Sequence, residues 1–254
     1  METAKSTLKK IRAINRMSAG QRIKSYLRHP LSLTLALLVC LAALITVCML
    51  VFIVVYILAK GIPYLTPSLF ELEYTTENVS LFPAIVTTIE MTLLSLLIAA
   101  PLGILTAVYL VEYAKRGNKL VGLVRLTSET LSGIPSIVYG LFGMLFFVTA
   151  VHWGYSLISG AFTLAIMILP LIMRTTEEAL KSVPDPYREA SFGLGAGKLR
   201  TAFVIVLPSA VPGILAGVIL AVGRIVGETA ALIYTAGTVA QIPMGKDFLF
   251  MSGR

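Results

Sequence analysis

Residues 189–195 read Glu-Ala-Ser-Phe-Gly-Leu-Gly, and nine residues later positions 205–208 read Ile-Val-Leu-Pro. The first motif lies in a polar segment, residues 174–203, that separates two long apolar stretches, and the second directly follows it. Helices in a bundle are usually joined by only about 2–8 residues. A polar, glycine-containing segment of this length therefore predicts a structured loop with a role of its own.

The composition around this loop is that of a helical membrane protein. Hydrophobic residues make up 57% of the chain and charged residues 13%, against roughly 25% charged in soluble domains. Several stretches reach the ~20 apolar residues that a helix needs to cross a bilayer. We expect an all-α, polytopic protein with about five transmembrane helices, at 31–59, 82–111, 133–150, 161–173 and 208–236.

The positive charges lie between the apolar stretches. The net charge is +8, with eight Lys and Arg residues in positions 1–30 and none in positions 61–114. Cytoplasmic loops of membrane proteins carry the excess of Lys and Arg. The pattern therefore predicts that residues 1–30 are a basic cytoplasmic arm, and it does not favour nucleic acid as a partner.

A short helix is expected inside the polar segment. Asp185 can cap its first backbone N–H groups, and Pro186 suits the first helical position. The helix would extend over about residues 187–194, and the glycines between 193 and 197 would allow a sharp turn after it. A short rigid helix followed by a bend suits a lever that lies in a groove of a partner protein.

The spacing of these motifs resembles the cytoplasmic coupling loop of binding-protein-dependent ABC importer permeases. That loop reads Glu-Ala-Ala, three residues, Gly, nine residues and Ile-x-Leu-Pro, and here Ser191 replaces the second Ala. The resemblance implies that a separate ATPase subunit receives the loop. The implied ATPase-coupling residues are Tyr187, Arg188, Glu189, Ala190, Ser191 and Gly195. Considered without the resemblance, the segment could be an amphipathic helix that lies on the membrane surface.

Four other segments narrow the resemblance to the PstA type of phosphate ABC importer permease. They read PLGILTAVYLVEYA at 101–114, LSGIPSIVYG at 131–140, LPLIMRTTEEAL at 169–180 and GRIVGETAA at 223–231. The resemblance extends over roughly residues 81–237. It implies the MetI-like permease fold, in which this chain forms half of a phosphate pore in the inner membrane of the cell.

The same resemblance implies the partners and the domain organisation. A second, PstC-like permease would complete the pore, PstB-like subunits would hydrolyse ATP with Mg²⁺, and an external PstS-like protein would deliver phosphate. This chain would contact membrane lipid and bind no cofactor itself. We expect a basic arm at 1–30, a first transmembrane helix at 31–59, and a permease core at 82–254 with its coupling loop at 174–203. The family normally has one more helix, for which residues 237–254 show no apolar run.

Two charged residues inside the fifth apolar stretch are candidates for the substrate pathway. Arg224 and Glu228 are four positions apart, so on one helix they would share a face and could pair. Gly213 and Gly217 fall on nearly the same stripe and favour close approach of another helix. The Arg224 guanidinium can donate two hydrogen bonds to phosphate, with Glu228 as its counter-charge. A purely structural buried ion pair is the alternative.

Three further residues complete the set of pathway candidates. Glu90 lies inside the second apolar stretch, where an acid needs a partner or access to water. Ser132 and Ser136 lie near the positive start of the expected third helix, which favours an anion, although capping and helix packing explain them equally well. Pro101 is expected to kink the second helix.

No catalytic triad, metal-ligand cluster or ATP-binding motif is recognisable in the sequence. Residues 193–198, Gly-Leu-Gly-Ala-Gly-Lys, lack the spacing of a phosphate-binding loop, and Leu199 stands where a hydroxyl belongs. We therefore expect a permease subunit that is not itself an enzyme. The alternatives are a permease for another oxyanion such as molybdate or sulfate, a membrane subunit that signals phosphate status, and a secondary transporter.

Overall fold

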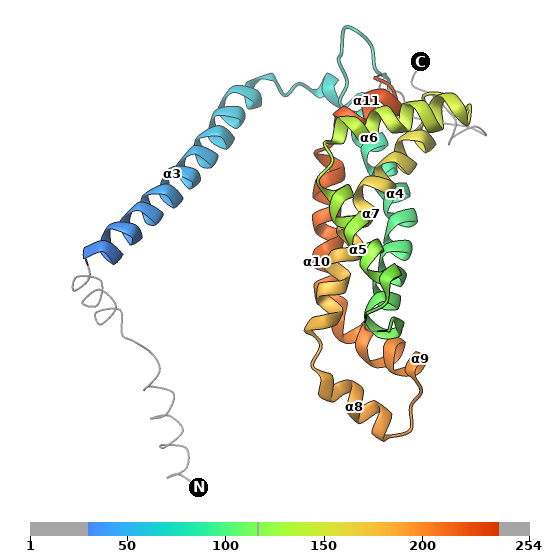
Figure 1. Ribbon diagram of the computed structural model, residues 1–254. Helices are drawn as coiled ribbons and strands as arrows, with labels where there is room; N and C mark the ends of the chain where they lie inside the picture. The colour runs from blue at the N-terminus through green and yellow to red at the C-terminus, as the bar shows by residue number, and fades with distance from the viewer. Residues whose placement is uncertain (1–29, 116, 239–254) are drawn as a thin grey trace. The chain divides into compact units, whose positions relative to one another are not determined.

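The computed structural model describes residues 30–115 and 117–238, and within them all regular structure is helical (Figure 1). The chain divides into two units, residues 1–66 and 67–254. Four helices of the described residues are long and apolar enough to cross a membrane, or five if one bent pair counts as a span. The expected all-α fold with about five spans is confirmed. The expected basic arm, save for Pro30, lies outside the described residues.

The described part of the first unit is dominated by α3 (Pro30–Gly61). Hydrophobic residues occupy every face of this helix, and none of its residues is buried within the described structure. A helix that is hydrophobic all round is stable in lipid or against other apolar helices. The predicted helix at 31–59 is confirmed. Two short 3₁₀ turns, η1 (Ile62–Tyr64) and η2 (Pro67–Phe70), follow along the chain.

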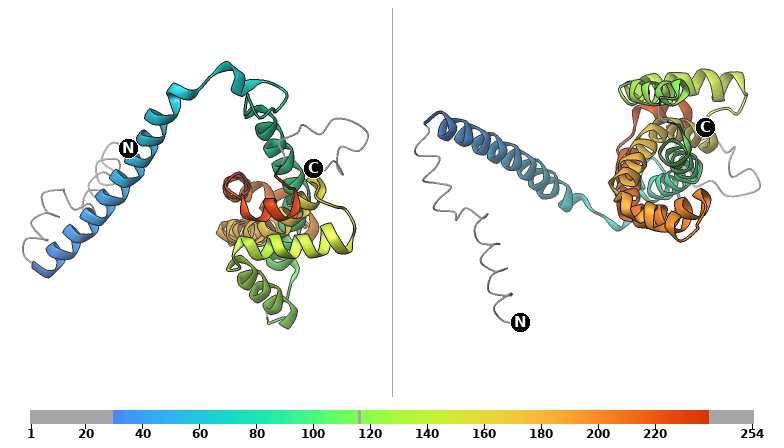
Figure 2. Two further views of the ribbon diagram at one scale, coloured as in Figure 1. Left: turned by 90° about the horizontal axis from the view of Figure 1, so that it is seen from above. Right: turned by 60° about the horizontal axis from the view of Figure 1, so that its bottom comes forward.

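The second unit is a helical bundle built around α7 (Leu157–Ser182). The helices α4 (Phe82–Val108) and α10 (Leu207–Val226) pack along α7, as Figures 1 and 2 show from different sides. In its most apolar part 67% of α7 is buried, against 33% of the span that contains α4 and 22% of the span that contains α10. The core therefore lies along α7, where Leu164 and Ile168 are fully buried.

The central helix is longer than predicted. Residues 174–182, which we expected in the polar loop, are the last turns of α7. Two ion pairs at i,i+4 spacing support this polar part of the helix: Arg174 with Glu178 at 3.3 Å, and Lys181 with Glu177 at 2.6 Å. The hydrophobic stretch thus marks where the helix can enter lipid and does not mark where it ends.

The fifth predicted helix is displaced toward the N-terminus at both of its ends. A continuous helical span runs over Lys198–Val226, formed by α9 (Lys198–Arg200), the π-helical η5 (Thr201–Val206) and α10. The predicted start at residue 208 is a proline in the first turn of α10, where the preceding π-helical turn tolerates its missing N–H. The span ends before Gly227, and a separate short helix, α11 (Ala230–Thr235), follows.

The third predicted helix is confirmed over residues 136–150, and the expected linker before it forms a further helix that lies at a sharp angle to it. Residues expected in a linker form α5 (Lys119–Ser132), which is followed by α6 (Ser136–Gly143) and the π-helical η4 (Met144–Ala150). The two parts meet at an angle of 102°. Pro135 explains the break, since the residue before a proline is disfavoured in a helix. In Figure 1, α5 runs along the bundle, whereas α6 crosses its end beside α11.

The bundle therefore has two distinct ends. We call the end where α6 and α11 lie the α6 end. At the opposite end lies a short helix, α8 (Asp185–Gly193), and we call this the α8 end (Figure 1). The helix α4 continues through Pro101 and runs on into the π-helical η3 (Tyr109–Tyr113) at the α8 end.

Candidate functional site

The motif that starts at Glu189 lies mostly on α8, at the α8 end of the bundle. The expected short helix is confirmed and begins two residues earlier than predicted. The expected cap is wrong, because Asp185 makes no capping hydrogen bond and its Oδ1 instead accepts one from Arg188 Nη1 at 3.2 Å. Gly195 has a φ of +84°, which other residues rarely adopt, so the turn after α8 requires a glycine there.

Arg188 fixes the inner side of α8 to the rest of the bundle. Its Nε and Nη2 donate to Glu112 Oε1 at 3.1 and 2.8 Å, across 76 positions of sequence. Nη2 also donates to the Leu180 carbonyl at 2.9 Å, and Nη1 to the Val183 carbonyl at 2.8 Å. The Arg188 and Glu112 side chains are only 15% and 10% exposed. These contacts, which we call the Arg188 clamp, tie α8 to the end of α7 and to η3 with charge-assisted hydrogen bonds.

A second contact joins α8 to the helix that follows the loop. Ser191 Oγ and Thr201 Oγ1 lie 2.8 Å apart, and both residues are buried. The Ala that the importer motif has at position 191 could not make this hydrogen bond. The serine therefore links α8 directly to η5, which is part of the span that leads to Arg224.

The outer side of α8 and the turn after it are exposed and partly apolar. Tyr187 is 55% exposed, Phe192 45% and Leu194 90%, and Glu189 and Ala190 are exposed beside them. Exposed large apolar side chains on a short helix and the turn after it are available to bind another protein. Of the predicted coupling residues, the outer side holds Tyr187, Glu189 and Ala190, the inner side Arg188 and Ser191, and the turn Gly195.

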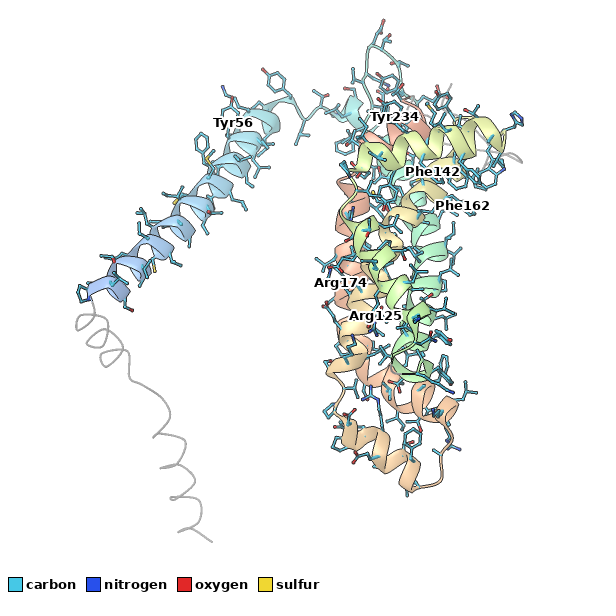
Figure 3. The ribbon with its side chains drawn as sticks, viewed as in Figure 1. Tyr56, Arg125, Phe142, Phe162, Arg174 and Tyr234 are labelled. Carbon is cyan, nitrogen blue, oxygen red and sulfur yellow. The ribbon has the colours of Figure 1, made fainter. Side chains whose placement is uncertain are left out.

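A buried acid holds α5 in place nearer the middle of the bundle. The Glu177 side chain on α7 is 9% exposed, and its Oε1 lies 2.6 Å from both Arg125 Nη2 of α5 and Lys181 Nζ. Figure 3 shows Arg125 on α5 and Arg174 on α7 part-way along the bundle. Sequence reasoning missed this network. The i,i+4 spacing of Glu177 and Lys181 could have indicated half of it, but no sequence signal placed Arg125 there.

The predicted pair of Arg224 and Glu228 does not form. Arg224 lies in the last turn of α10, whereas Glu228 lies beyond the break at Gly227, so the two do not share a helix face. Glu228 Oε1 instead accepts a hydrogen bond from the Ala231 N–H at 3.1 Å, at the start of α11. Arg224 is half-buried, and no ion pair joins it to another of the described residues.

The glycine stripe of α10 packs against another helix, as its spacing predicts. A Cβ atom at Gly213 would lie 2.6 Å from the Cβ of Ala179, and one at Gly217 would lie 2.7 Å from the Cβ of Thr175. Both distances are well inside van der Waals contact, so α10 and α7 approach each other more closely than larger side chains would allow. The predicted helix contact is confirmed, and its partner is α7.

The remaining pathway candidates form no hydrogen bond or ion pair with Arg224 within the described residues. Glu90 is half-buried on α4, and its Oε2 is buried without a hydrogen-bond partner in the described residues. Ser132 is exposed at the end of α5 and donates to the Glu129 carbonyl at 2.7 Å, as local capping requires. Ser136 is the first residue of α6. Within the described part of the chain, no hydrogen bond or ion pair joins these side chains to one another.

Comparison with known proteins places this arrangement among membrane permeases. Residues 99–249 match the family described as the binding-protein-dependent transport system inner membrane component. The probable ABC transporter permease protein YqgI of Bacillus subtilis is 46% identical over 144 residues, which are 57% of this chain and 49% of that protein. This chain thus spans about half the length of YqgI.

Other relatives are covered over more of their length. The phosphate transport system permease protein PstA of Pasteurella multocida is 41% identical over 213 residues, 83% of this chain and 74% of that protein. PstA 2 of Mycobacterium tuberculosis is 36% identical over 82% of this chain and 67% of that protein. Among solved structures, the inward-facing MetNI methionine ABC transporter aligns with a TM-score of 0.48 at 23% identity, over 58% of this chain and 68% of that one.

The family match and the Pasteurella relative agree with the resemblance expected from the coupling loop. The match begins at residue 99 and ends at residue 249, so it includes α8 and the span over Lys198–Val226. It also extends over more than half of the 254 residues. This chain therefore belongs to the binding-protein-dependent transport system inner membrane component family.

Proposed function

We propose that this chain is a transmembrane subunit of an ATP-driven phosphate importer and forms half of its pore. Two relatives that bear the name phosphate transport system permease, at 41% and 36% identity over more than four fifths of this chain, support phosphate as the substrate. The observation that carries the proposal is the construction of α8. Its inner side is fixed by the Arg188 clamp, and its outer side is exposed. A helix that transmits motion from an ATPase subunit needs both an exposed surface for that subunit and a firm attachment to its own bundle.

The α8 end is the cytoplasmic one in this proposal. Lys and Arg residues gather there, which follows the positive-inside rule, while residues 67–81, which precede α4, carry three acids and no cation. The N-terminus would also be cytoplasmic. PstB-like ATPase subunits would bind the outer side of α8 and hydrolyse ATP with Mg²⁺, so this chain would need no cofactor of its own. A PstC-like permease and an external PstS-like phosphate-binding protein complete the complex.

Motion of α8 would reach the pore by two routes. The Arg188 clamp transmits the motion of α8 to η3 and α7, and the Ser191–Thr201 hydrogen bond transmits it to η5. The continuous helical span that begins at Lys198 would carry the motion toward Arg224. The distance between these two residues along the helix axis is about 39 Å at ~1.5 Å per residue. In the proposed cycle, ATP binding closes the ATPase pair, α8 moves, the pore opens to receive the anion, and hydrolysis resets it.

Arg224 is the residue of the pathway set that best fits phosphate contact. It is half-buried near the α6 end, and Glu228 does not neutralise it because that carboxylate hydrogen-bonds at the start of α11. Glu90 would find its partner in the second permease, since its Oε2 has none in the described residues. Ser132 and Ser136 flank the break between α5 and α6 and remain weaker candidates. Uptake by Arg224→Gln near the wild-type rate, at normal membrane levels, would rule out the Arg224 role.

Radiolabelled phosphate uptake tests the proposed function. The chain is co-expressed with its partner subunits in cells that lack their own phosphate importer. We expect ATP-dependent phosphate uptake with the wild-type chain, loss of uptake with Gly195→Pro, and retention with Gly197→Ala, whose φ is ordinary. Labelled molybdate and sulfate are measured in parallel. Uptake of either of these instead of phosphate would replace the proposal with the other oxyanion permease.

A further inference from the structure

A pocket lies at the α8 end beside the Arg188 clamp, and two clamp residues, Arg188 and Glu112, form part of its wall. It has a volume of about 760 Å³ and lies between η3, the start of α5, the end of α7 and α8. Small-molecule sites usually measure roughly 300–1,000 Å³. Its charged lining residues in the described chain are five cations and two acids, namely Lys115, Lys119, Arg125, Lys181, Arg188, Glu112 and Asp185.

The ion pairs around the pocket leave two of its cations uncompensated. Arg188 is paired with Glu112 and Asp185, and Glu177 behind the wall pairs with both Arg125 and Lys181. Lys115 and Lys119 are exposed, and neither has an ion-pair partner among the residues that the structure describes. Their ammonium groups are therefore free to bind an anion that enters from solvent or from the membrane surface.

The backbone between η3 and α5 brings these two lysines to the same pocket. Gly117 has a φ of +83°, which a glycine adopts without strain, and the Asn118 N–H donates to the Lys115 carbonyl at 3.2 Å. Asn118 Oδ1 then accepts from the Leu120 N–H at 3.0 Å and caps α5. The α5 N-terminus at this pocket adds partial positive charge to that of the lysines.

We propose that this pocket binds a phosphate group, carried by the headgroup of an anionic lipid or by free inorganic phosphate. Basic pockets between transmembrane helices bind anionic headgroups, and the pocket lies where the span Phe82–Tyr113 ends. A lysine ammonium group is a compact positive charge that binds phosphate. The neighbouring arginines, Arg125 and Arg188, are held in place by their ion pairs with Glu177 and Glu112. The site lies beside the Arg188 clamp, toward the opposite end of the bundle from Arg224, so it does not depend on which anion the pore carries.

Binding to the full chain in lipid nanodiscs tests the proposal in two arms. In nanodiscs of phosphatidylcholine, equilibrium binding of ³²P-labelled inorganic phosphate is measured. In nanodiscs that also contain phosphatidylglycerol, the retained anionic lipid is counted by native mass spectrometry after detergent extraction. A site for free phosphate shows in the first arm and a headgroup site in the second, and either result supports the proposal.

Lys115→Gln/Lys119→Gln is the test variant, and Lys198→Gln/Arg200→Gln is the matched control, which removes the same charge at the same end outside the pocket. Each surface lysine contributes on the order of a fivefold change in anionic binding, so the test variant should weaken binding about tenfold or more in one arm. The control should change binding less than about twofold. Equal losses in both variants, no loss in either, or loss only with Arg224→Gln would overturn the proposal. Both lysines are exposed, so folding should be unaffected.

Discussion

The two ends of the bundle are held together by different interactions. At the α8 end, the Arg188 clamp and the Ser191–Thr201 hydrogen bond join α8 to three other segments through buried polar contacts. At the α6 end, a Cβ at Gly140 would lie only 2.8 Å from the Cα of Ala231, and a buried contact between helices uses uncharged groups, the Ser156 N–H donating to the Thr235 carbonyl at 3.1 Å. Arg224 and Glu90, toward that end, have no charged partner in the described residues. In the proposed function, the α8 end would be the mechanical end, held by contacts within this chain, and the α6 end would be the pore end, whose charges need a partner or a substrate.

Of the changes proposed, removal of the Arg188 clamp should cause the largest loss of stability, and it tests whether the α8 end is held rigidly. Arg188→Ala leaves the Glu112 carboxylate buried without its partner, and breaking a buried pair costs about 3–5 kcal/mol. Thermal unfolding of the full chain in detergent should show a correspondingly lower Tm. Arg174→Ala is the matched control, because it removes an exposed pair with Glu178 that contributes at most about 1 kcal/mol. Equal losses in the two variants would contradict a rigid α8 end.

Overpacking of the glycine stripe should have the next largest effect. Gly217→Val would push a side chain into Thr175 of α7, and such insertions cost about 1–3 kcal/mol. Gly223→Val makes the same change on the same helix where no atom lies within 4 Å. The difference in unfolding temperature between the two variants isolates the helix contact. A Gly217→Val protein as stable as Gly223→Val would show that α10 and α7 are not closely packed.

Loss of the hydrogen bond between α8 and η5 should have a smaller, local effect. Ser191→Ala leaves the buried Thr201 hydroxyl without a partner, at a cost of about 1 kcal/mol. Hydrogen–deuterium exchange of the α8 amides should therefore become about fivefold faster. Ser209→Ala, an exposed serine that bonds only within its own helix, is the control. Unchanged exchange in α8 would mean that this hydrogen bond does not hold α8 in place.

The smallest expected effect is the energetic coupling of Arg224 to Glu228. Because Glu228 lies beyond the end of the helix that carries Arg224 and no ion pair joins the two, a double-mutant cycle should be additive within about 0.5 kcal/mol. The cycle combines Arg224→Gln and Glu228→Gln and measures unfolding in detergent. A coupling energy well above 1 kcal/mol would show that the two side chains form the ion pair that the sequence spacing suggested.

The apolar spans and the coupling helix could be predicted from sequence because their signals are local. The helix at 31–59 follows from an unbroken apolar run, and α8 with its turn follows from Pro186 in its first turn and Gly195 after its end. The match over residues 99–249 confirms the resemblance carried by the same short motifs. Local patterns therefore sufficed to identify the family and to locate its coupling segment.

The predictions that were wrong concern features that depend on contacts between residues distant in sequence, or on single residues that end helices. Hydropathy could not show that α7 continues to Ser182, because ion pairs and not lipid support its last turns. Gly227 separates Arg224 from Glu228, so a spacing argument that assumed one helix gave the wrong partner. Glu112 is 76 positions from Arg188, and only the folded bundle shows that the two meet.

The most direct test measures how much phosphate is transported per ATP hydrolysed when the complex is reconstituted in proteoliposomes. This ratio shows whether α8 drives the pore through the Arg188 clamp. Glu112→Gln keeps the size of the side chain and removes the charge that holds Arg188. We expect this variant to keep its ATP hydrolysis while its phosphate transport per ATP falls several-fold. A ratio equal to that of the wild type, at equal subunit content, would contradict transmission through the clamp.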